Sequence, residues 1–549
     1  MRLGALAAGL LALGVAAWPA APRAGAGGGP NDVTPEASAT AAAAGEPTSP
    51  QPALASPSAP EAAAAPAPEA PPRMPAFGAS PELPPESWAV RAAARLEALG
   101  LLTGYFPAQQ AVPLLAVWAA LEEGARRAEA ERPDVASLAR AWRQRFHDEW
   151  RGADAGGLLR FLGGQASAGY GWAGASPPPA SPPPRTWSLW PPDESDPSVA
   201  ATAAGALSEY VAASVSPVAV PWQVRWFGEV VAGVGPVSLS WGRNAAQYGF
   251  GAQGAGVVFG GLAPVERVEL LTHRPIDIGI GLLAFDVYLG FLGPPRHEGH
   301  PLLWGMSLQY RPVPRLAFGL QRGTMLGGTA WKDATGSGFD VGDFLTTAFG
   351  PGNGPENNVI SLSARWRLPT ESFLPATLYL EWGGDDNGGA WLQAPGIGVG
   401  FLLPSLPFAP EVSVGLEASF FGTLCPDETG GALCRSPGYP LDWYTHGAYA
   451  GGWAVGDAPL GHRMGGNGRE LWLHAAADLL DARLRVRGDA FVRNRFQGNL
   501  YAPYAGTSGG FEAQVVYRAW LGEVGLSGGL EAGPGWTSGR AGARATVYF

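Results

Sequence analysis

The last nine residues, 541–549, constrain the fold of this chain more than any other stretch. Apolar or small side chains occupy every second position, and polar or interfacial ones lie between them: Ala541, Ala543, Ala545, Val547 and Phe549 against Arg544, Thr546 and Tyr548. This period of two predicts a β-strand with one face toward lipid and the other toward a watery interior. A soluble sheet has no use for an exposed terminal Phe, whereas the last strand of a membrane barrel pairs with the first and ends in an aromatic girdle. The stretch therefore predicts a transmembrane β-barrel.

The same alternation recurs in four internal segments, residues 302–311, 360–368, 411–420 and 483–492. In the last of these, Arg483, Arg485 and Arg487 share one face, where each would cost ~2–4 kcal/mol if it pointed into lipid at mid-depth. We therefore expect these arginines to face a polar lumen and to pair with carboxylates such as Glu381, Glu411 or Glu417.

Connection lengths support the same architecture. The turns at 311–315 and 480–482 are short, whereas the segments 174–200, 331–357, 385–396 and 421–470 are long and rich in Pro, Gly, Asp and Asn. Short turns on one side and long loops on the other are typical of outer-membrane barrels. The predicted fold is an all-β transmembrane barrel of about 16–18 antiparallel strands with a small N-terminal periplasmic α-helical bundle.

Composition excludes other classes. Charged residues make up 15% of the chain, below the ~25% of a typical globular protein, while aromatic residues reach 10% with 21 Trp. The net charge of −11 argues against a nucleic-acid partner. No internal apolar run is long enough for a helical membrane span.

The N-terminal part divides into three predicted regions. Residues 1–26 have the composition of a secretory signal peptide, with a single Arg2 before an apolar run and a small-residue cleavage site at 24–26. Residues 27–80 are almost entirely Ala, Pro, Gly, Ser and Glu, which predicts a disordered tail. Residues 81–155 show helical periodicity, with helices expected at 86–99, at 112–121 with Pro113 in its first turn, and at 134–150 with Asp134 as cap. The barrel is expected to occupy 156–549.

The helical hairpin at 86–125 resembles an S-layer-homology hairpin. The similar residues are Trp88, Leu96, Leu99 and Gly100, a Gly-Tyr-Phe-Pro turn at 104–107, and Trp118 and Leu121. This resemblance implies contact with peptidoglycan. The alternative is a three-helix bundle that only packs on the periplasmic end of the barrel.

The two cysteines, Cys425 and Cys434, lie in one Pro- and Gly-containing segment. Behind an export signal they predict a small disulfide in an oxidising compartment. Their spacing matches no standard zinc site and no His lies between them, so we expect no metal.

Four blocks along the barrel, at 241–259, 304–328, 378–386 and 444–462, resemble sequence motifs of the Wzi-type capsule-assembly family. The matching positions are Gly242, Arg243, Gly249, Gly251, Arg322, Gly327, Gly328, Glu381 and Asp386. The family implies a large outer-membrane barrel with a periplasmic helical bundle that ties capsular or exopolysaccharide to the cell surface. The terminal Phe549 also resembles the assembly signal of bacterial outer-membrane barrels.

Enzymatic motifs are weak. Residues 249–254 match a dinucleotide fingerprint only as text, without a βαβ context, and residues 525–529 match a nucleophile elbow inside an alternating strand. His446 and His462 could pair with Asp442 or Asp457 in a hydrolytic site, but no suitable Ser is evident beside them. We expect no enzyme activity and no cofactor.

Recognition is the remaining function. The segment 421–470 concentrates aromatic and basic residues, and flat rings stack on sugars while Arg and His bind hydroxyl and acidic groups. The candidate polysaccharide-binding residues are Trp331, Trp443, Tyr444, His446, Tyr449, Trp453, His462 and Arg463. The alternative is an interfacial aromatic belt with ordinary loop packing.

The sequence therefore predicts a non-enzymatic protein of the Gram-negative outer membrane that binds or assembles surface polysaccharide. Its expected partners are outer-membrane lipid, capsule or exopolysaccharide and, through the helices, peptidoglycan. The alternative function is a cell-wall-attached porin for small solutes, which differs in whether the long loops leave the lumen open.

Overall fold

The computed structural model describes residues 79–107, 112–153, 158–176, 197–221, 223–350, 354–371, 373–385, 394–422, 443–456 and 458–549. All of them belong to one compact unit, 74–549. The predicted signal peptide, nearly all of the predicted tail, Asp386 and both cysteines lie outside the described residues, so the disulfide stays a prediction.

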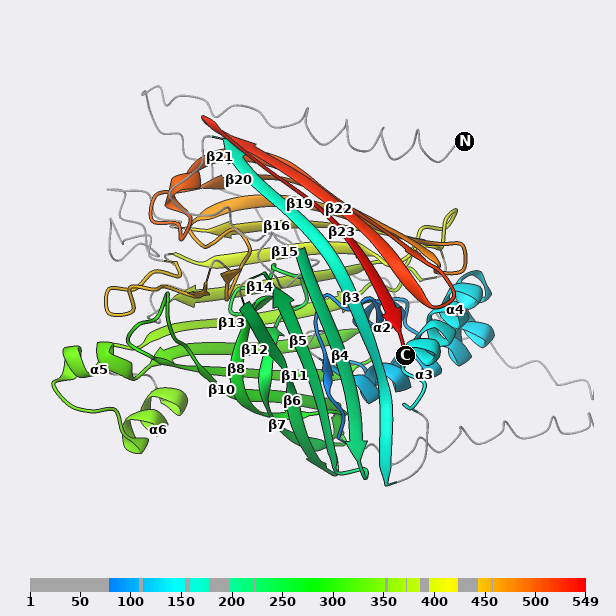
Figure 1. Cartoon of the computed structure of the whole chain (residues 1–549), viewed down its shortest axis with the longest axis horizontal. Coiled ribbons are helices and arrows are strands. Elements are labelled where there is room, and N and C mark those ends of the chain that lie inside the picture. The colour runs from blue at the N-terminus through cyan, green and yellow to red at the C-terminus, as the bar shows by residue number, and fades with distance from the viewer. Residues whose placement is uncertain are drawn as a thin grey trace, which may run out of the picture. The chain divides into compact units, whose positions relative to one another are not determined.

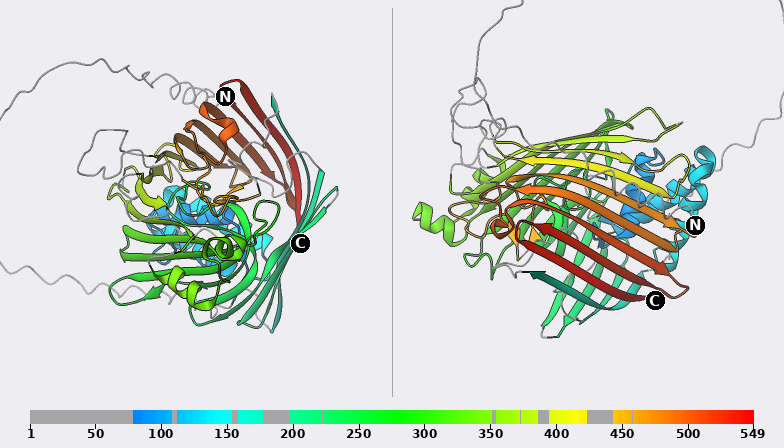
Figure 2. Two further views of the ribbon diagram at one scale, coloured as in Figure 1. Left: turned by 90° about the vertical axis from the view of Figure 1, so that its left-hand side faces the viewer. Right: turned by 90° about the horizontal axis from the view of Figure 1, so that it is seen from above.

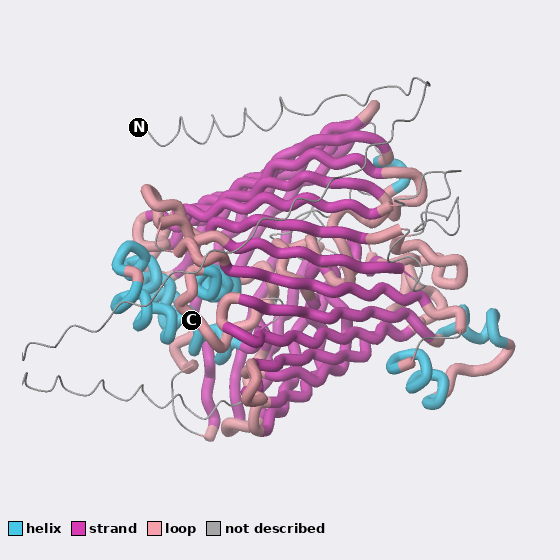
Figure 3. Tube along the Cα trace, turned by 180° about the vertical axis from the view of Figure 1, so that it is seen from behind, coloured by secondary structure: helices cyan, strands magenta, loops and turns pink. Residues whose placement is uncertain are grey.

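Most of the described chain forms a closed barrel of eighteen long antiparallel strands and one two-residue strand (Figures 1 and 3). The first nine strands are β3 (Leu159–Ser176), β4 (Pro197–Leu207), β5 (Val211–Val220), β6 (Gln223–Val234), β7 (Val237–Gln247), β8 (Gly260–Thr272), the short β9 (Ile276–Asp277), β10 (Leu282–Phe291) and β11 (Leu302–Val313). The others are β12 (Leu316–Leu326), β13 (Asn357–Arg367), β14 (Thr377–Asp385), β15 (Gly396–Leu403), β16 (Val412–Phe421), β19 (Gly468–Leu479), β20 (Leu484–Arg495), β21 (Gly506–Arg518), β22 (Gly522–Gly533) and β23 (Trp536–Tyr548). The predicted barrel, including its strand number, is confirmed.

The barrel closes where the sequence predicts it, between the last strand and the first. β23 pairs with β3 along its whole length, from Thr537 opposite Ser176 to Tyr548 opposite Gln165. The backbone of Phe549 extends this ladder by exchanging two hydrogen bonds with Gly164, of 2.9 and 3.0 Å. Its exposed ring stacks on Phe161.

Side chains alternate between an apolar outer face and a polar inner face. On β11, Leu308 is exposed and its neighbours Ser307 and Gln309 are buried, and β13, β16 and β20 follow the same pattern. The outer face carries large apolar residues, including Trp226 at 63% and Trp241 at 59% exposure. An outer surface of this kind is what a lipid bilayer requires.

The predicted arginine face needs two corrections. Arg483 is exposed and lies in the turn before β20 rather than in the strand. Arg485 pairs with Glu523 at 3.2 Å, and Arg487 pairs with Asp489 at 3.0 Å. The carboxylates expected as partners, Glu381 and Glu417, are instead engaged by the loops described below.

The alternation gives a matched pair of variants on β5. Val215 lies on the outer face, whereas its neighbour Ser214 faces the lumen opposite Glu229. We expect Val215→Arg to reduce the free energy of unfolding of the vesicle-folded protein by about 2–4 kcal/mol, because the guanidinium would point into lipid. Ser214→Arg gains a carboxylate neighbour and should change it by less than about 1 kcal/mol. Denaturant titration of the vesicle-folded protein measures both, and equal losses would contradict the assigned faces.

Within the described residues, three helices precede the barrel: α2 (Trp88–Ala98), α3 (Leu114–Glu131) and α4 (Pro133–Glu149), with β1 (Glu82–Leu83) paired to β2 (Val112–Pro113). They share a core that includes Leu96, Leu121 and Trp142. The predicted ends were partly wrong, because Pro113 precedes α3 rather than lying in its first turn. The N-cap of α4 is Arg132 with Pro133 as the first helical residue, not Asp134. The likeness of 86–125 to an S-layer-homology hairpin stays a prediction.

Buried ion pairs hold the helices against the short-turn end of the barrel. Glu97 of α2 accepts a hydrogen bond of 2.9 Å from Arg311 and a second bond from Arg365. Nearby, Arg95 donates to the carbonyls of Pro404 and Pro410 in the β15–β16 connection, at 2.5 and 2.6 Å. The longer loops leave the opposite end, where α5 (Gly328–Thr335) and α6 (Val341–Phe349) lie (Figure 2). None of the helices in the described parts of the chain has the length and apolar character to cross a bilayer.

Candidate functional site

Two loops fold into the barrel and pack on each other there. We call them together the luminal plug, residues 248–259 from the β7–β8 connection and the described residues of 443–467 from the β16–β19 connection. The second loop includes the short paired strands β17 (Ala454–Val455) and β18 (Ala458–Pro459). Their contact forms one hydrophobic core with inward residues of the barrel wall, and its plug members include Tyr248, Val257, Phe259, Trp443, Tyr444, Trp453 and Leu460. The two loops therefore form a packed unit inside the barrel rather than a layer at its rim.

Two carboxylates on the barrel wall hold the first plug loop by its backbone. Glu381 of β14 accepts a hydrogen bond from the N–H of Val257 at 3.2 Å, and Glu417 of β16 accepts one from Ala252 at 2.6 Å. Hydrogen bonds to a charged group are stronger than neutral ones, so each carboxylate is an effective anchor.

Two glycines of the family motif allow this close approach. Gly249 has φ +97°, and a Cβ at this position would lie 2.6 Å from Glu381 Oε2. At Gly251 a Cβ would lie 2.6 Å from the Cβ of Ala255 and 3.2 Å from Glu417 Oε1. The spacing of the two glycines therefore follows from the two carboxylates that the loop must reach.

The second plug loop attaches to the first through Tyr444 and Trp453. The backbone N–H of Tyr444 donates to Asp385 of β14 at 2.7 Å, and its hydroxyl donates to the carbonyl of Val257. The Trp453 indole N–H donates to the carbonyl of Val258 at 2.8 Å. Both rings are fully buried, so each satisfies a buried backbone carbonyl that water cannot reach.

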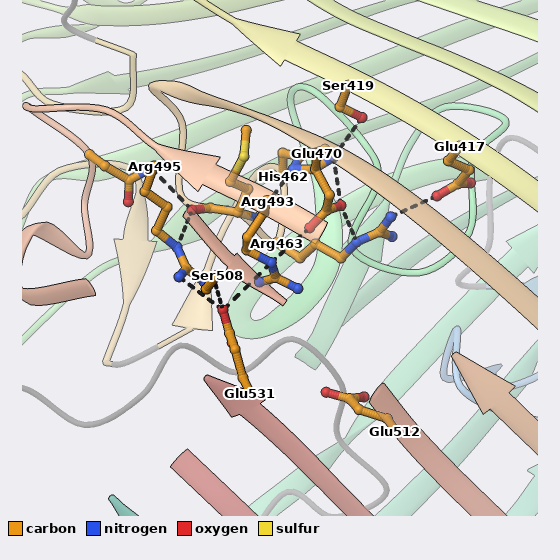
Figure 4. Close-up of polar contacts among 12 residues, drawn as sticks. Glu417, Ser419, His462, Arg463, Glu470, Arg493, Arg495, Ser508, Glu512 and Glu531 are labelled. Carbon is orange, nitrogen blue, oxygen red and sulfur yellow. Dashed lines mark hydrogen bonds and ion pairs between the residues drawn. The ribbon is translucent and has the colours of Figure 1, made fainter. Parts of the chain in front are cut away.

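Arg463 is the ionic centre of the plug (Figure 4). Its guanidinium donates to Glu417 at 2.9 Å, to Glu470 of β19 at 2.8 Å and to the carbonyl of Gln253 at 3.2 Å. It also lies over the ring of Trp472, 3.9 Å from the centroid. Because Glu417 holds the first loop and Arg463 belongs to the second, this one cation joins both loops to two barrel strands.

His462 has a neighbour that sequence analysis missed. Its Nε2 lies 3.0 Å from Ser419 Oγ on β16 (Figure 4). The Nδ1 atom accepts a hydrogen bond from the backbone N–H of Met464, so Nε2 carries the proton and donates it. Burial lowers the pKa of His462 to about 4, which keeps the ring neutral at pH 7. A ring in this tautomer presents no lone pair to the serine hydroxyl, so the pair lacks the arrangement of a serine hydrolase.

The predicted partners Asp442 and Asp457 lie outside the described residues. The position of Ser419 was predictable from the sequence, because the alternation of β16 places its side chain on the inner face of the barrel. Only the inward folding of the loop, which the sequence did not indicate, brings His462 to it.

A further motif residue, Arg322 of β12, caps α6. Its guanidinium donates to the carbonyls of Thr347, Ala348 and Gly350 at 2.7, 3.2 and 3.1 Å. A cation at the carboxyl end of a helix is favourable because the last carbonyls lack partners within the helix.

The remaining motif positions shape the neighbouring backbone. Gly327 and Gly328, both at φ +71°, form the turn into α5. The carbonyl of Gly327 accepts a bond of 3.3 Å from the hydroxyl of Tyr449. Gly242 leaves room for the neighbouring strand, because a Cβ there would lie 2.5 Å from the carbonyl oxygen of Gly228, and the guanidinium of Arg243 lies over the ring of Phe227.

The candidate polysaccharide-binding residues lie mostly inside the protein. The buried ones are Trp331, Trp443, Tyr444, Tyr449, Trp453, His462 and Arg463. His446 is half-buried beside the ring of Tyr449, and Trp331 packs edge-on against Phe339. In this arrangement the buried rings contact protein, so a sugar could stack on them only after the plug moves. A sugar-binding role for these residues stays a prediction.

This architecture has a counterpart in a known protein family. The family described as capsule assembly protein Wzi matches residues 228–487, from β6 to β20. Residues 228–487 belong to the Wzi family. This Wzi-family segment includes both loops of the luminal plug, the three strands β14, β16 and β19 that anchor them, and all of the motif positions discussed above.

One solved structure shares the fold over most of its length. The Escherichia coli outer-membrane protein Wzi, reported as a carbohydrate-binding β-barrel involved in group 1 capsule assembly, matches with a TM-score of 0.64 at 15% sequence identity. The match covers 86% of this chain and 99% of that one. OccK3 (OpdO) and OpdQ of Pseudomonas aeruginosa are matched with TM-scores of 0.42 at 10% and 8% identity, over 70% and 71% of this chain and 95% and 98% of theirs. No curated protein matches the sequence.

Proposed function

We propose that this chain is an outer-membrane protein that binds capsular or exopolysaccharide at the cell surface and takes part in its assembly there, without catalysing a reaction. Membership of residues 228–487 in the Wzi family supports this proposal, as does the fold shared with the carbohydrate-binding barrel of Escherichia coli. The outward apolar face supports a membrane location.

The observation that carries the proposal is that the family match spans both plug loops and their anchors. The matched residues build a packed, ion-paired plug around Arg463 rather than an open bore. A porin for small solutes needs a water-filled channel, so that alternative has less support.

Binding is tested with the purified full chain in lipid nanodiscs. Biosensor titration should show saturable binding of an acidic capsular polysaccharide, and a neutral dextran of similar length should not bind. We expect 0.5 M NaCl to weaken the binding of the acidic polysaccharide, because exposed charge contacts are screened at that ionic strength. Failure of several acidic surface polysaccharides to bind above the dextran background would overturn the proposal.

A further inference from the structure

The lumen retains a cavity of about 350 Å³ between α2 and one side of the barrel wall. Its wall comes from β3–β8 and β20–β23, and many of the lining residues are small, such as Ala200, Ala204, Gly525 and Gly542. These small side chains leave the space of the cavity open. A volume of this size lies within the range of small-molecule binding sites.

The charged residues that line the cavity are four arginines and four glutamates: Arg91, Arg243, Arg485 and Arg544, and Glu82, Glu86, Glu149 and Glu523. Two of these carboxylates are already held by guanidinium groups from outside the lining, Glu82 by Arg267 at 3.1 Å and Glu149 by Arg145 at 2.7 Å. Glu523 accepts hydrogen bonds from both Arg145, at 2.6 Å, and Arg485, at 3.2 Å. Asp489 is paired with Arg487 at 3.0 Å. The Nε–H of Arg485 is buried with no hydrogen-bond partner among the described residues. Positive charge at this site is therefore only partly compensated.

Arg91 of α2 lines the cavity and is the least compensated of these cations. Within the described parts of the chain its side chain makes no hydrogen bond and no ion pair. Burial, and then the charges of Arg487 and Arg485, lower the pKa of Arg91 to about 9, against the weaker opposing effect of Glu86. An anion bound beside Arg91 would relieve this repulsion.

The rest of the lining offers hydroxyl and amide groups. Five such residues line the cavity from β3, β4, β5 and β21: Gln165, Ser167, Thr202, Ser216 and Gln514. Groups that both donate and accept hydrogen bonds suit the hydroxyls of a sugar ring. Guanidinium groups suit a carboxylate.

We propose that this luminal cavity is a second binding site, which takes an acidic sugar with its carboxylate on Arg91 and Arg485 and its hydroxyls on the Ser, Thr and Gln side chains. The inference rests on the proposed function for its ligand class, but its location inside the barrel, beside α2, is separate from any contact with polymer at the cell surface. At this site the lumen holds a single acidic sugar unit of a glycan.

Isothermal titration calorimetry of the purified full chain tests the site with glucuronate as the probe. Glucuronate should bind with one site per chain, and Arg91→Gln should weaken it by about tenfold or more, since a charged hydrogen bond is lost. Arg91 makes no ion pair within the described chain and is repelled by Arg485 and Arg487, so this variant should fold. Arg126→Gln on α3, an exposed position, serves as the matched control and should leave the affinity unchanged.

The outcomes separate this inference from the proposed function. Absence of glucuronate binding, or equal affinity for the Arg91→Gln variant, would overturn the cavity site even if acidic polymer still binds to nanodiscs. Glucose binding as tightly as glucuronate would overturn the role of the carboxylate. Inorganic phosphate binding as tightly would overturn the sugar assignment and leave a general anion site. Loss of polymer binding with retained glucuronate binding would instead count against the proposed function alone.

Discussion

Replacing Arg463 with alanine is expected to open the luminal plug and give the barrel a steady ion conductance. Arg463 pairs with both Glu417 and Glu470, so the substitution leaves the buried Glu417 without an ion-pair partner among the described residues and Glu470 with Arg493 alone. Loss of one partner from a buried ion pair typically costs about 3–5 kcal/mol. Because Arg463 joins the two loops to β16 and β19, this loss should weaken their attachment and let the loops separate. Single-channel recording in planar bilayers measures the change.

Two further variants test whether the conductance arises from the uncompensated buried charge. Adding Glu417→Gln to Arg463→Ala removes one uncompensated charge, so the double variant should conduct less often than the single one. Arg315→Ala breaks an exposed pair with Glu371 at the short-turn end and should leave the barrel as silent as the unmodified protein. A silent Arg463→Ala barrel would contradict the role assigned to this residue.

Replacing Glu97 with glutamine is expected to release the helices from the barrel. Glu97 lies between Arg311 and Arg365, and its backbone carbonyl also accepts a bond from Arg367 at 3.1 Å. The isosteric amide keeps the shape but leaves the buried guanidiniums to repel each other. We expect a loss of about 3–5 kcal/mol in docking free energy. It should appear as faster proteolysis of residues 79–153 while the barrel itself stays folded.

Glu131→Gln provides the matched control. Glu131 forms an exposed pair with Arg127 within α3, so its loss should change stability by less than about 0.5 kcal/mol. Equal proteolysis rates for both variants and the unmodified protein would show that the ion pairs of Glu97 do not hold the helices in place.

The barrel was predictable because its signal is local. Alternation within a single strand, as at Leu308 and Gln309, already fixes which face meets lipid, and Phe549 marks the closing strand. The partners of inward charges were not predictable, because they depend on register across several strands. Arg485 pairs with Glu523 two strands away, and no pattern within β20 indicates that distance.

The inward folding of the plug loops was not predictable from the sequence for a different reason. Trp443, Tyr444 and Trp453 have the composition of a sugar-binding loop, and the same composition serves equally well for a buried core. The direction in which a loop folds depends on its whole set of anchors, here Glu381, Glu417 and the carbonyls of Val257 and Val258. Motif glycines such as Gly249 were visible in the sequence, but the carboxylate that requires a glycine there was visible only in the fold.

The most direct test of the account is the conductance of the unmodified protein, recorded in planar bilayers before and after acidic polysaccharide is added. We expect a nearly silent barrel in both conditions, together with saturable polysaccharide binding by the same preparation. A large, steady conductance that the glycan does not affect would contradict it, because the barrel would then be an open pore rather than a plugged, polysaccharide-binding one.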